Sequence, residues 1–185
     1  MRKGFLVLFA LFVSFSAAEA VTVEKVVHTT GVKGGLIVHV GCEDGTFAAA
    51  LGADGPFVVQ ALSKNPQTVM TAREQVKSAG RYGNVSIKHF DGTHLPYVDS
   101  MVNLLIVSNP EKLSADEVMR VLAPEGFVLL QEGKNIPGLK TSSMNRLDGW
   151  KIVQKKWPDE LDEWTHYLHN PCGSSVSEDL VAGKP

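Results

Sequence analysis

The sequence predicts an α/β fold, a three-layer αβα sandwich built around a mostly parallel β-sheet. Two observations predict it. Short apolar runs alternate along the chain with segments of helical period. The connections between successive runs are long enough to return the chain, so the strands can run parallel with helices on both faces of the sheet.

The first twenty residues are predicted to be a secretory signal peptide and are set apart from the fold. Arg2 and Lys3 form a basic start, residues 5–15 form an apolar run, and residues 18–20 form a small-x-small cleavage site. The run is shorter than the roughly 20 residues that span a membrane, and an uncleaved anchor is the alternative. The mature chain is expected to begin near Val21, exported to the periplasm or outside the cell, with no integral membrane span.

The composition of the mature chain argues against several functions. Removing Arg2, Lys3 and Glu19 leaves sixteen Lys and Arg against nineteen Asp and Glu, a formal charge near −3, without a basic block. A nucleic-acid partner or a membrane-surface role therefore has no electrostatic support. Cys42 and Cys172 are too few for a disulfide scaffold, and we expect two separate thiols.

The first half of the chain carries most of the predicted alternation. In order, it is expected to form a short helix or strand within 21–35, a strand over 36–40, a helix over 46–51, a strand over 57–62, a helix over 66–78 and a strand over 85–90. Asn65 before Pro66 is typical of a helix start. Val69, Ala72 and Val76 are spaced to form one buried face of that helix.

The second half continues the pattern and then loses it. We expect a strand over 101–107, a helix capped by Ser114 that ends near Leu122, a turn over 123–126 and a strand over 127–131. These boundaries divide the chain into a signal peptide (1–20), an α/β domain (21–132), a linker with one additional strand near 150–156 (133–156), and an extended tail or junction to a further domain (157–185).

The stretch LIVHVGCEDG, from Leu36 to Gly45, has the pattern of a ligand-binding turn. A buried strand is followed by two glycines and then by a short helix. Glycine allows the backbone to turn sharply and to approach a ligand closely, and a helix start offers unpaired N–H groups. In open α/β sheets such a turn commonly holds a nucleotide.

Four segments together resemble class I S-adenosylmethionine-dependent methyltransferases, in the branch called methyltransferase type 11. They are VHVGCEDG, NPQTVMTARE, DGTHLPYVDSMVNLL and EVMRVLAPEGFVLL, and they fall in the family's order and spacing within residues 30–131. The resemblance implies a Rossmann-like methyltransferase fold with seven strands. It also implies S-adenosylmethionine as cofactor, lying across the carboxyl ends of the strands, and a methyl acceptor that the sequence leaves unknown.

The resemblance further implies which residues contact the cofactor. Gly41 and Gly45 would approach its methionine part, and Ser63 lies where the second strand normally presents an acid to the ribose. Asp91, with Gly92 beside it, lies where a carboxylate commonly binds the adenine amino group. The full set of candidate cofactor-binding residues is His39, Gly41, Cys42, Glu43, Gly45, Ser63, Asp91, Gly92 and Ser108. No catalytic residue and no metal ligand is predicted.

Four positions depart from the family pattern. His39 replaces an acid, Glu43 replaces a glycine, Ser63 replaces the ribose acid, and Asn103 replaces an aspartate. Charge-assisted hydrogen bonds to the ribose are worth about 1.5–3 kcal/mol, so their loss would weaken binding tenfold or more. The charge of Glu43 would also oppose the carboxylate of the cofactor. We therefore expect a degenerate site with weakened cofactor binding.

Several residues allow two interpretations. His39 is either a cofactor or proton-transfer residue, or a strand histidine satisfied by a neighbour. Glu43 and Asp44 either bind a metal or are acids stabilised at a helix start. His166 and His169 either ligate a metal or belong to a solvated tail. The second interpretation is favoured in each case.

One cysteine is a potential nucleophile. Cys42 lies beside two acids, Glu43 and Asp44, which would raise the pKa of its thiol. A raised pKa disfavours the reactive thiolate, so we expect Cys42 to be structural.

The tail carries a second resemblance. WPDELDEWTHYLHNP is similar to the segment that joins a methyltransferase-like region to a β-propeller of the pyrroloquinoline-quinone type in some secreted bacterial proteins. Two functions are therefore expected. One is methyl transfer, which depends largely on proximity and needs few acid or base residues. The other is a noncatalytic binding or assembly module of a secreted multidomain protein.

Overall fold

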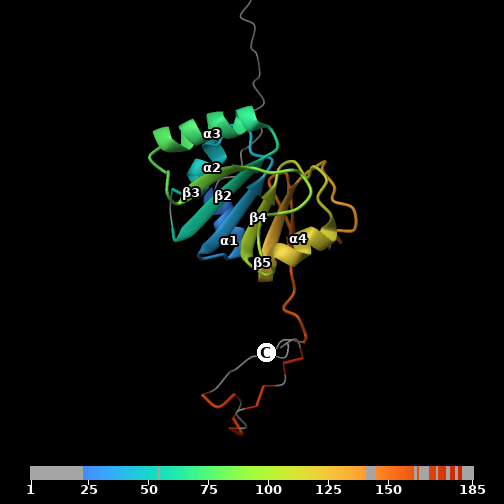
Figure 1. The fold of residues 1–185 in the computed structure, drawn as a ribbon. Coiled ribbons are helices and arrows are strands. Elements are labelled where there is room, and N and C mark those ends of the chain that lie inside the picture. Colours follow the sequence, from blue (N-terminus) through green and yellow to red (C-terminus); the bar gives the residue numbers. More distant parts are fainter. Residues whose placement is uncertain are drawn as a thin grey trace, which may run out of the picture.

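The fold is that of a computed structural model of the chain (Figure 1). A single seven-stranded sheet has the strand order β3-β2-β1-β4-β5-β7-β6. Helices pack on both of its faces, as the three-layer prediction requires. The structure describes residues 23–53, 55–140, 145–160, 162, 167–169, 171–173, 176–177 and 179–180.

The helices and strands alternate along most of the chain. The described strands are β1 (Gly35–Val40), β2 (Phe57–Ser63), β3 (Val85–His89), β4 (Val102–Val107), β5 (Leu122–Gln131), β6 (Asn145–Leu147) and β7 (Trp150–Gln154). The described helices are α1 (Val23–Thr30), α2 (Thr46–Leu51), α3 (Pro66–Ser78) and α4 (Ala115–Val121). The expected helices over 46–51 and 66–78 are confirmed residue for residue.

The order of the strands creates a switch point between β1 and β4. The chain builds β1, β2 and β3 outward in one direction, and then returns to place β4 on the other side of β1. The first five strands along the chain, β1 to β5, run parallel, whereas β7 runs antiparallel to β5 and to β6. Because the connections after β1 and β4 leave in opposite directions, a crevice is expected at the carboxyl ends of these two strands.

Two apolar layers enclose the central strands. Alternate residues of a strand point to opposite faces, so Ile37 packs with α1, α2 and α3, whereas Val38 packs with α4. The helix starts were predicted correctly: Asn65 accepts a hydrogen bond from the Gln67 N–H, and Ser114 accepts one from the Glu117 N–H. The fold is therefore anchored on both faces by residues that the sequence pattern identified.

The predicted turn over 123–126 is wrong. These residues lie inside β5, where the register against β4 shifts between the pairs made by Val102 and Leu104. Glu125 adopts a left-handed conformation with φ 60°, and a Cβ on Gly126 would lie 2.8 Å from the carbonyl oxygen of Ala123. The turn-forming residues therefore bend a continuous strand as a bulge instead of ending it.

The sheet extends beyond residue 132. The strand expected near 150–156 is confirmed as β7, which pairs with both β5 and β6. Asp148 and Gly149, with φ 32° and 83°, make the tight turn between β6 and β7. Asp-Gly is a strong hairpin signal that the sequence analysis overlooked.

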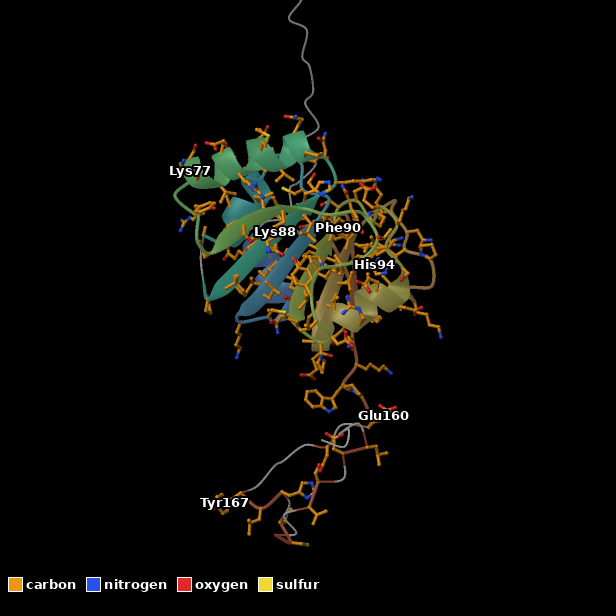
Figure 2. All side chains as sticks on the ribbon, viewed as in Figure 1. Lys77, Lys88, Phe90, His94, Glu160 and Tyr167 are labelled. Atoms are coloured by element: carbon orange, nitrogen blue, oxygen red, sulfur yellow. The ribbon has the colours of Figure 1, made fainter. Side chains whose placement is uncertain are left out.

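The C-terminal tail leaves the sheet at the end opposite the carboxyl ends of the parallel strands. β7 runs antiparallel, and the N–H of Lys155, just after it, donates to the carbonyl of Gly126 near the start of the paired part of β5. Glu160 and Tyr167 lie well away from the sheet (Figure 2). Within the described part of the chain, no helix is both long enough and apolar enough to cross a membrane. The expected signal peptide lies outside the described residues.

Candidate functional site

Two neighbouring cavities lie at the carboxyl ends of the strands around the switch point. The first cavity has a volume of about 440 Å³ and the second about 380 Å³, within the roughly 300–1,000 Å³ of small-molecule sites. The first is lined by His39, Gly41, Cys42, Glu43, Asp44, Gly45, Phe47, Ala48, Ser108, Gln131, Asp148, Gly149 and Trp150. The second is lined by Gly41, Cys42, Glu43, Leu62, Ser63, Lys64, Asn65, Phe90, Asn109 and Glu111.

The loop from Gly41 to Gly45 lines the first cavity, and its residues 41–43 also line the second. Gly41 has φ 88°, and a Cβ there would lie 2.5 Å from the backbone nitrogen of Asn109. Gly45 has φ 83°, and a Cβ there would lie 2.8 Å from the carbonyl oxygen of Ala72 in α3. The fold itself therefore requires both glycines, because their backbone conformation and close packing exclude a side chain.

The two acids of this loop are in different situations. The Asp44 carboxylate accepts a hydrogen bond from the Thr46 N–H at 2.9 Å, at the start of α2. This contact supports the interpretation of an acid at a helix start. The Glu43 side chain is exposed and makes no hydrogen bond or salt bridge with any described residue. Glu43 is therefore an unpaired negative charge on the wall between the cavities.

His39 lies at the end of β1 beneath α2 and is only 5% exposed. Its Nε2 shares a 2.8 Å hydrogen bond with the Ser108 hydroxyl, and its ring packs edge-on against Phe47 with 5.3 Å between the centroids. Its Nδ1 is buried and makes no hydrogen bond within the described structure. The expected strand histidine is thus satisfied at one nitrogen only.

The pKa of His39 is lowered to about 4. Burial is the main cause, and the nearby Asp44 carboxylate only partly offsets it. The imidazole is therefore neutral at pH 7, where a carboxylate would carry a negative charge. The first cavity is consequently lined by a neutral ring with one unpaired nitrogen.

The second cavity contains a carboxylate that the sequence analysis missed. Glu111 follows β4 and accepts a 2.9 Å hydrogen bond from the Asn109 side-chain amide. Lys64, which follows β2, lies 3.6 Å from the other Glu111 carboxylate oxygen. Glu111 has φ 52°, and the neighbouring Lys112 N–H donates to the carbonyl of Gly92 at 2.9 Å. The Glu111 side chain is thus held by Asn109 and Lys64, and it lines the same cavity as Ser63.

The remaining candidate residues divide between the cavities and the loops. His39, Gly45 and Ser108 line the first cavity, and Ser63 lines the second. Asp91 lines neither, nor does Gly92, although a Cβ on Gly92 would lie 3.4 Å from the Glu111 Cβ.

The carboxylate of Asp91 is occupied by its own loop. It accepts hydrogen bonds from the N–H groups of Thr93 and His94 at 2.8 and 3.2 Å, and these bonds, chiefly those from Thr93, lower its pKa. The loop runs from β3 toward α4, past the labelled Phe90 and His94 (Figure 2). Asp91 therefore stabilises this loop. An adenine group could reach the Asp91 carboxylate only from outside the two cavities.

Cys42 is buried in the loop between the cavities. Burial raises the pKa of its thiol to about 11, and the neighbouring acids add to the effect. The thiol therefore stays protonated at neutral pH, in agreement with the prediction that it is structural.

The histidine pair of the tail is only partly described. His169 is buried and pairs with Asp162, so the expectation of a solvated residue is wrong there. His166 lies outside the described residues. Among the residues that the structure describes, no group of three or more His, Cys, Asp or Glu side chains could hold a metal ion.

Comparison with known proteins places this geometry in a wider class. No family model matches the chain, and no curated protein matches it. A candidate S-adenosyl-L-methionine-dependent methyltransferase from Methanococcus maripaludis superposes with a TM-score of 0.55 at 18% identity, over 60% of this chain and 53% of that one. The chain has the class I methyltransferase fold.

Two further structures show the range of proteins with this methyltransferase fold. A geranyl diphosphate methyltransferase in complex with S-adenosylmethionine has a TM-score of 0.50 at 15% identity, over 58% of this chain and 46% of that one. The 4+2 cyclase SpnF has a TM-score of 0.51 at 20% identity, over 73% and 52%. The chain thus spans about half the length of these structures. Because the fold occurs in a cyclase too, the reaction must be argued from the site.

S-adenosylmethionine fits one half of this site better than the other. The second cavity offers the aromatic ring of Phe90, the Ser63 hydroxyl and the Glu111 carboxylate, which suit a nucleoside with its ribose hydroxyls. The first cavity has the carboxylates of Glu43 and Asp44 and no Lys or Arg among its lining residues. The chemistry of the site therefore accommodates a nucleoside and opposes the carboxylate of a methionine group.

Proposed function

We propose that this chain is a methyltransferase-like domain of an exported protein that binds the nucleoside part of S-adenosylmethionine and transfers methyl groups poorly or not at all. The observation that carries the proposal is the second cavity, where a hydroxyl, a carboxylate and an aromatic side chain meet beside the switch point. In open α/β sheets this is the usual position of a nucleotide. The structures of similar fold, one of them holding S-adenosylmethionine, support the choice of nucleoside.

Weak transfer follows from the first cavity. Methyl transfer depends on holding the sulfonium methyl group and the acceptor in line, at an attack distance of about 3–3.5 Å. The methionine end of the cofactor can orient the sulfonium only if its carboxylate is tolerated. Glu43 opposes that carboxylate, and no lining residue of the first cavity compensates with a positive charge.

Adenosine tests the position of the nucleoside. In an amide NMR titration of the mature chain from Val21, we expect adenosine to shift the signals of Ser63, Phe90 and Glu111. Amide signals in α1 and β6, which lie outside the second cavity, serve as internal controls. An absence of shifts at several millimolar adenosine would contradict a nucleoside site, and so would shifts confined to the tail.

A noncatalytic binding or assembly role is the second candidate, and the path of the tail supports it. Residues after β7 leave the sheet at the end of the strands opposite both cavities. A following domain, such as the β-propeller expected from the tail resemblance, could attach there without covering the cavities. Export by the signal peptide is part of the proposal and agrees with a secreted multidomain protein.

A further inference from the structure

The exposed apolar side chains are concentrated in two places. Among the residues that the structure describes, ten large apolar side chains are exposed, and eight of them lie either at the amino ends of the parallel strands or in the tail after β7. The first group, which we call the amino-end surface, consists of Val58, Val98, Met101 and Trp157, and the second group consists of Tyr167, Leu168, Val176 and Leu180. Single exposed apolar residues are normal on a protein surface, whereas a concentration of them marks an interaction site.

The amino-end surface lies opposite both cavities. Val58 is the second residue of β2, and Met101 directly precedes β4, so both lie where parallel strands begin. Because β7 runs antiparallel to β5, Trp157, three residues after β7, lies beyond the same end of the sheet. The Lys155 side chain donates to the carbonyl of Leu122 at the start of β5, at 2.7 Å, and thereby holds the root of the tail at this end.

The loop that carries Val98 is fixed on both sides of this residue. The Tyr97 hydroxyl donates to the side-chain carbonyl of Gln60 in β2 at 2.7 Å. Arg120 donates to the carbonyl of Tyr97 at 2.8 Å and to the Asp99 carboxylate at 2.7 Å. Val98 is therefore held in an exposed position by the fold, and a surface that is already ordered loses less entropy when a partner binds.

The tail also makes contacts within itself. The N–H of Leu180 donates to the carbonyl of Glu160 at 3.0 Å, and the Ser177 hydroxyl lies 3.2 Å from the Asp162 carboxylate. These contacts bring the two ends of this part of the tail together, while Tyr167 is 95% exposed and lies well away from the sheet (Figure 2). The tail therefore presents apolar side chains at a distance from its own domain.

Charge distinguishes two ways in which two copies of the chain could bury these side chains. Residues 157–185 contain six Asp and Glu and one Lys, a formal charge of −5, whereas residues 21–156 contain fifteen Lys and Arg and thirteen Asp and Glu, a formal charge of +2. Two tails therefore repel each other, whereas a tail and a folded domain attract. Around the amino-end surface, Lys33 and Lys156 are exposed, together with the acid Glu125.

We propose that two copies of this chain associate by exchanging tails, so that each tail packs its apolar side chains on the amino-end surface of the other copy. The same contact made in both directions gives a twofold dimer. A standard interface takes roughly 20–30 residues from each side, and the tail, residues 157–185, is of that size. The contact uses neither cavity, so it holds or fails independently of the proposed function.

Sedimentation equilibrium of the mature chain from Val21 tests the association. We expect a dimer with a dissociation constant of ~10 μM. Met101→Glu should raise this constant at least about tenfold, because it places a negative charge where the acidic tail packs. Met70→Glu is the matched control: Met70, on α3, is 61% exposed against 49% for Met101, and its substitution should leave the constant unchanged. A chain that stays monomeric at about 200 μM would overturn the proposal, as would equal effects of the two substitutions.

Mixing two variants tests the exchange itself. Met101→Glu damages the surface, and the double substitution Tyr167→Ser with Leu168→Ser damages the tail, so each variant alone has both contacts of its dimer damaged. In an equimolar mixture, the intact tail of the first variant meets the intact surface of the second. We expect heterodimers at least about threefold tighter than either homodimer, with circular dichroism showing that both variants are folded. Absence of this gain would overturn the exchange, because surface-to-surface or tail-to-tail contacts are not restored by mixing.

Discussion

Replacing Glu43 by glycine and Ser63 by aspartate in the same chain should raise the affinity for S-adenosylhomocysteine by about a hundredfold to a thousandfold. An aspartate that accepts hydrogen bonds from two ribose hydroxyls contributes about 1.5–3 kcal/mol, which is roughly tenfold to a hundredfold in affinity. Removing the Glu43 charge from the cavity wall contributes about tenfold more, because it no longer opposes the ligand carboxylate. The measurement is calorimetric titration of the wild type, both single variants and the double variant.

Adenosine makes the two effects separable. Glu43→Gly should leave the affinity for adenosine within about twofold of the wild type, because adenosine has no carboxylate to oppose. Ser63→Asp should increase the affinity for adenosine and for S-adenosylhomocysteine alike. Glu43→Gln is the control for charge alone, since it keeps the side chain. No gain in affinity from the double variant, with its fold shown to be intact, would contradict the account of why the site is weak.

Gly41→Ala should lower the free energy of unfolding by about 3–5 kcal/mol. The alanine must adopt a left-handed backbone conformation, which costs about 1–2 kcal/mol. Its Cβ would lie 2.5 Å from the backbone nitrogen of Asn109, which cannot move without displacing the end of β4. Chemical denaturation measures the loss. Such a large effect would show that the fold requires this glycine, in addition to any requirement for ligand binding.

Gly133→Ala is the matched control. Gly133 has φ 82°, nearly the same as Gly41, but a Cβ there would have nothing within 4 Å. The free energy of unfolding of Gly133→Ala should therefore fall only by the conformational cost of about 1–2 kcal/mol. Equal losses in the two variants would mean that the contact with Asn109 does not constrain the loop.

Most of the fold could be predicted because its signals are local. The Asn65 and Ser114 caps, the apolar strands and the spacing of Val69, Ala72 and Val76 are each readable within one segment. The bulge in β5 could not be predicted, because residues 123–126 have turn chemistry and only pairing with β4 keeps them in a strand. β6 was not predicted, because a strand of three residues is too short to show an alternating pattern of its own.

The site was less predictable than the fold. The edge of the sheet was identified from the loop between β1 and α2, and six of the nine candidate residues line the first cavity. Glu111, Phe47 and Trp150 were missed as site residues because their place in it depends on tertiary packing. The proline and glutamate that follow β4 in the sequence NPEK were the available signal for Glu111, since loops after strands at a switch point meet the ligand. Burial of His169 likewise depends on its contact with Asp162.

We propose that the site binds a nucleoside and opposes the carboxylate at the methionine end of the cofactor. Calorimetric titration of the wild-type mature chain with adenosine and with S-adenosylhomocysteine tests it most directly. We expect the two ligands to bind with dissociation constants within about threefold of each other. S-adenosylhomocysteine binding about a hundredfold more tightly than adenosine would contradict it, and would instead indicate an intact methyltransferase cofactor site.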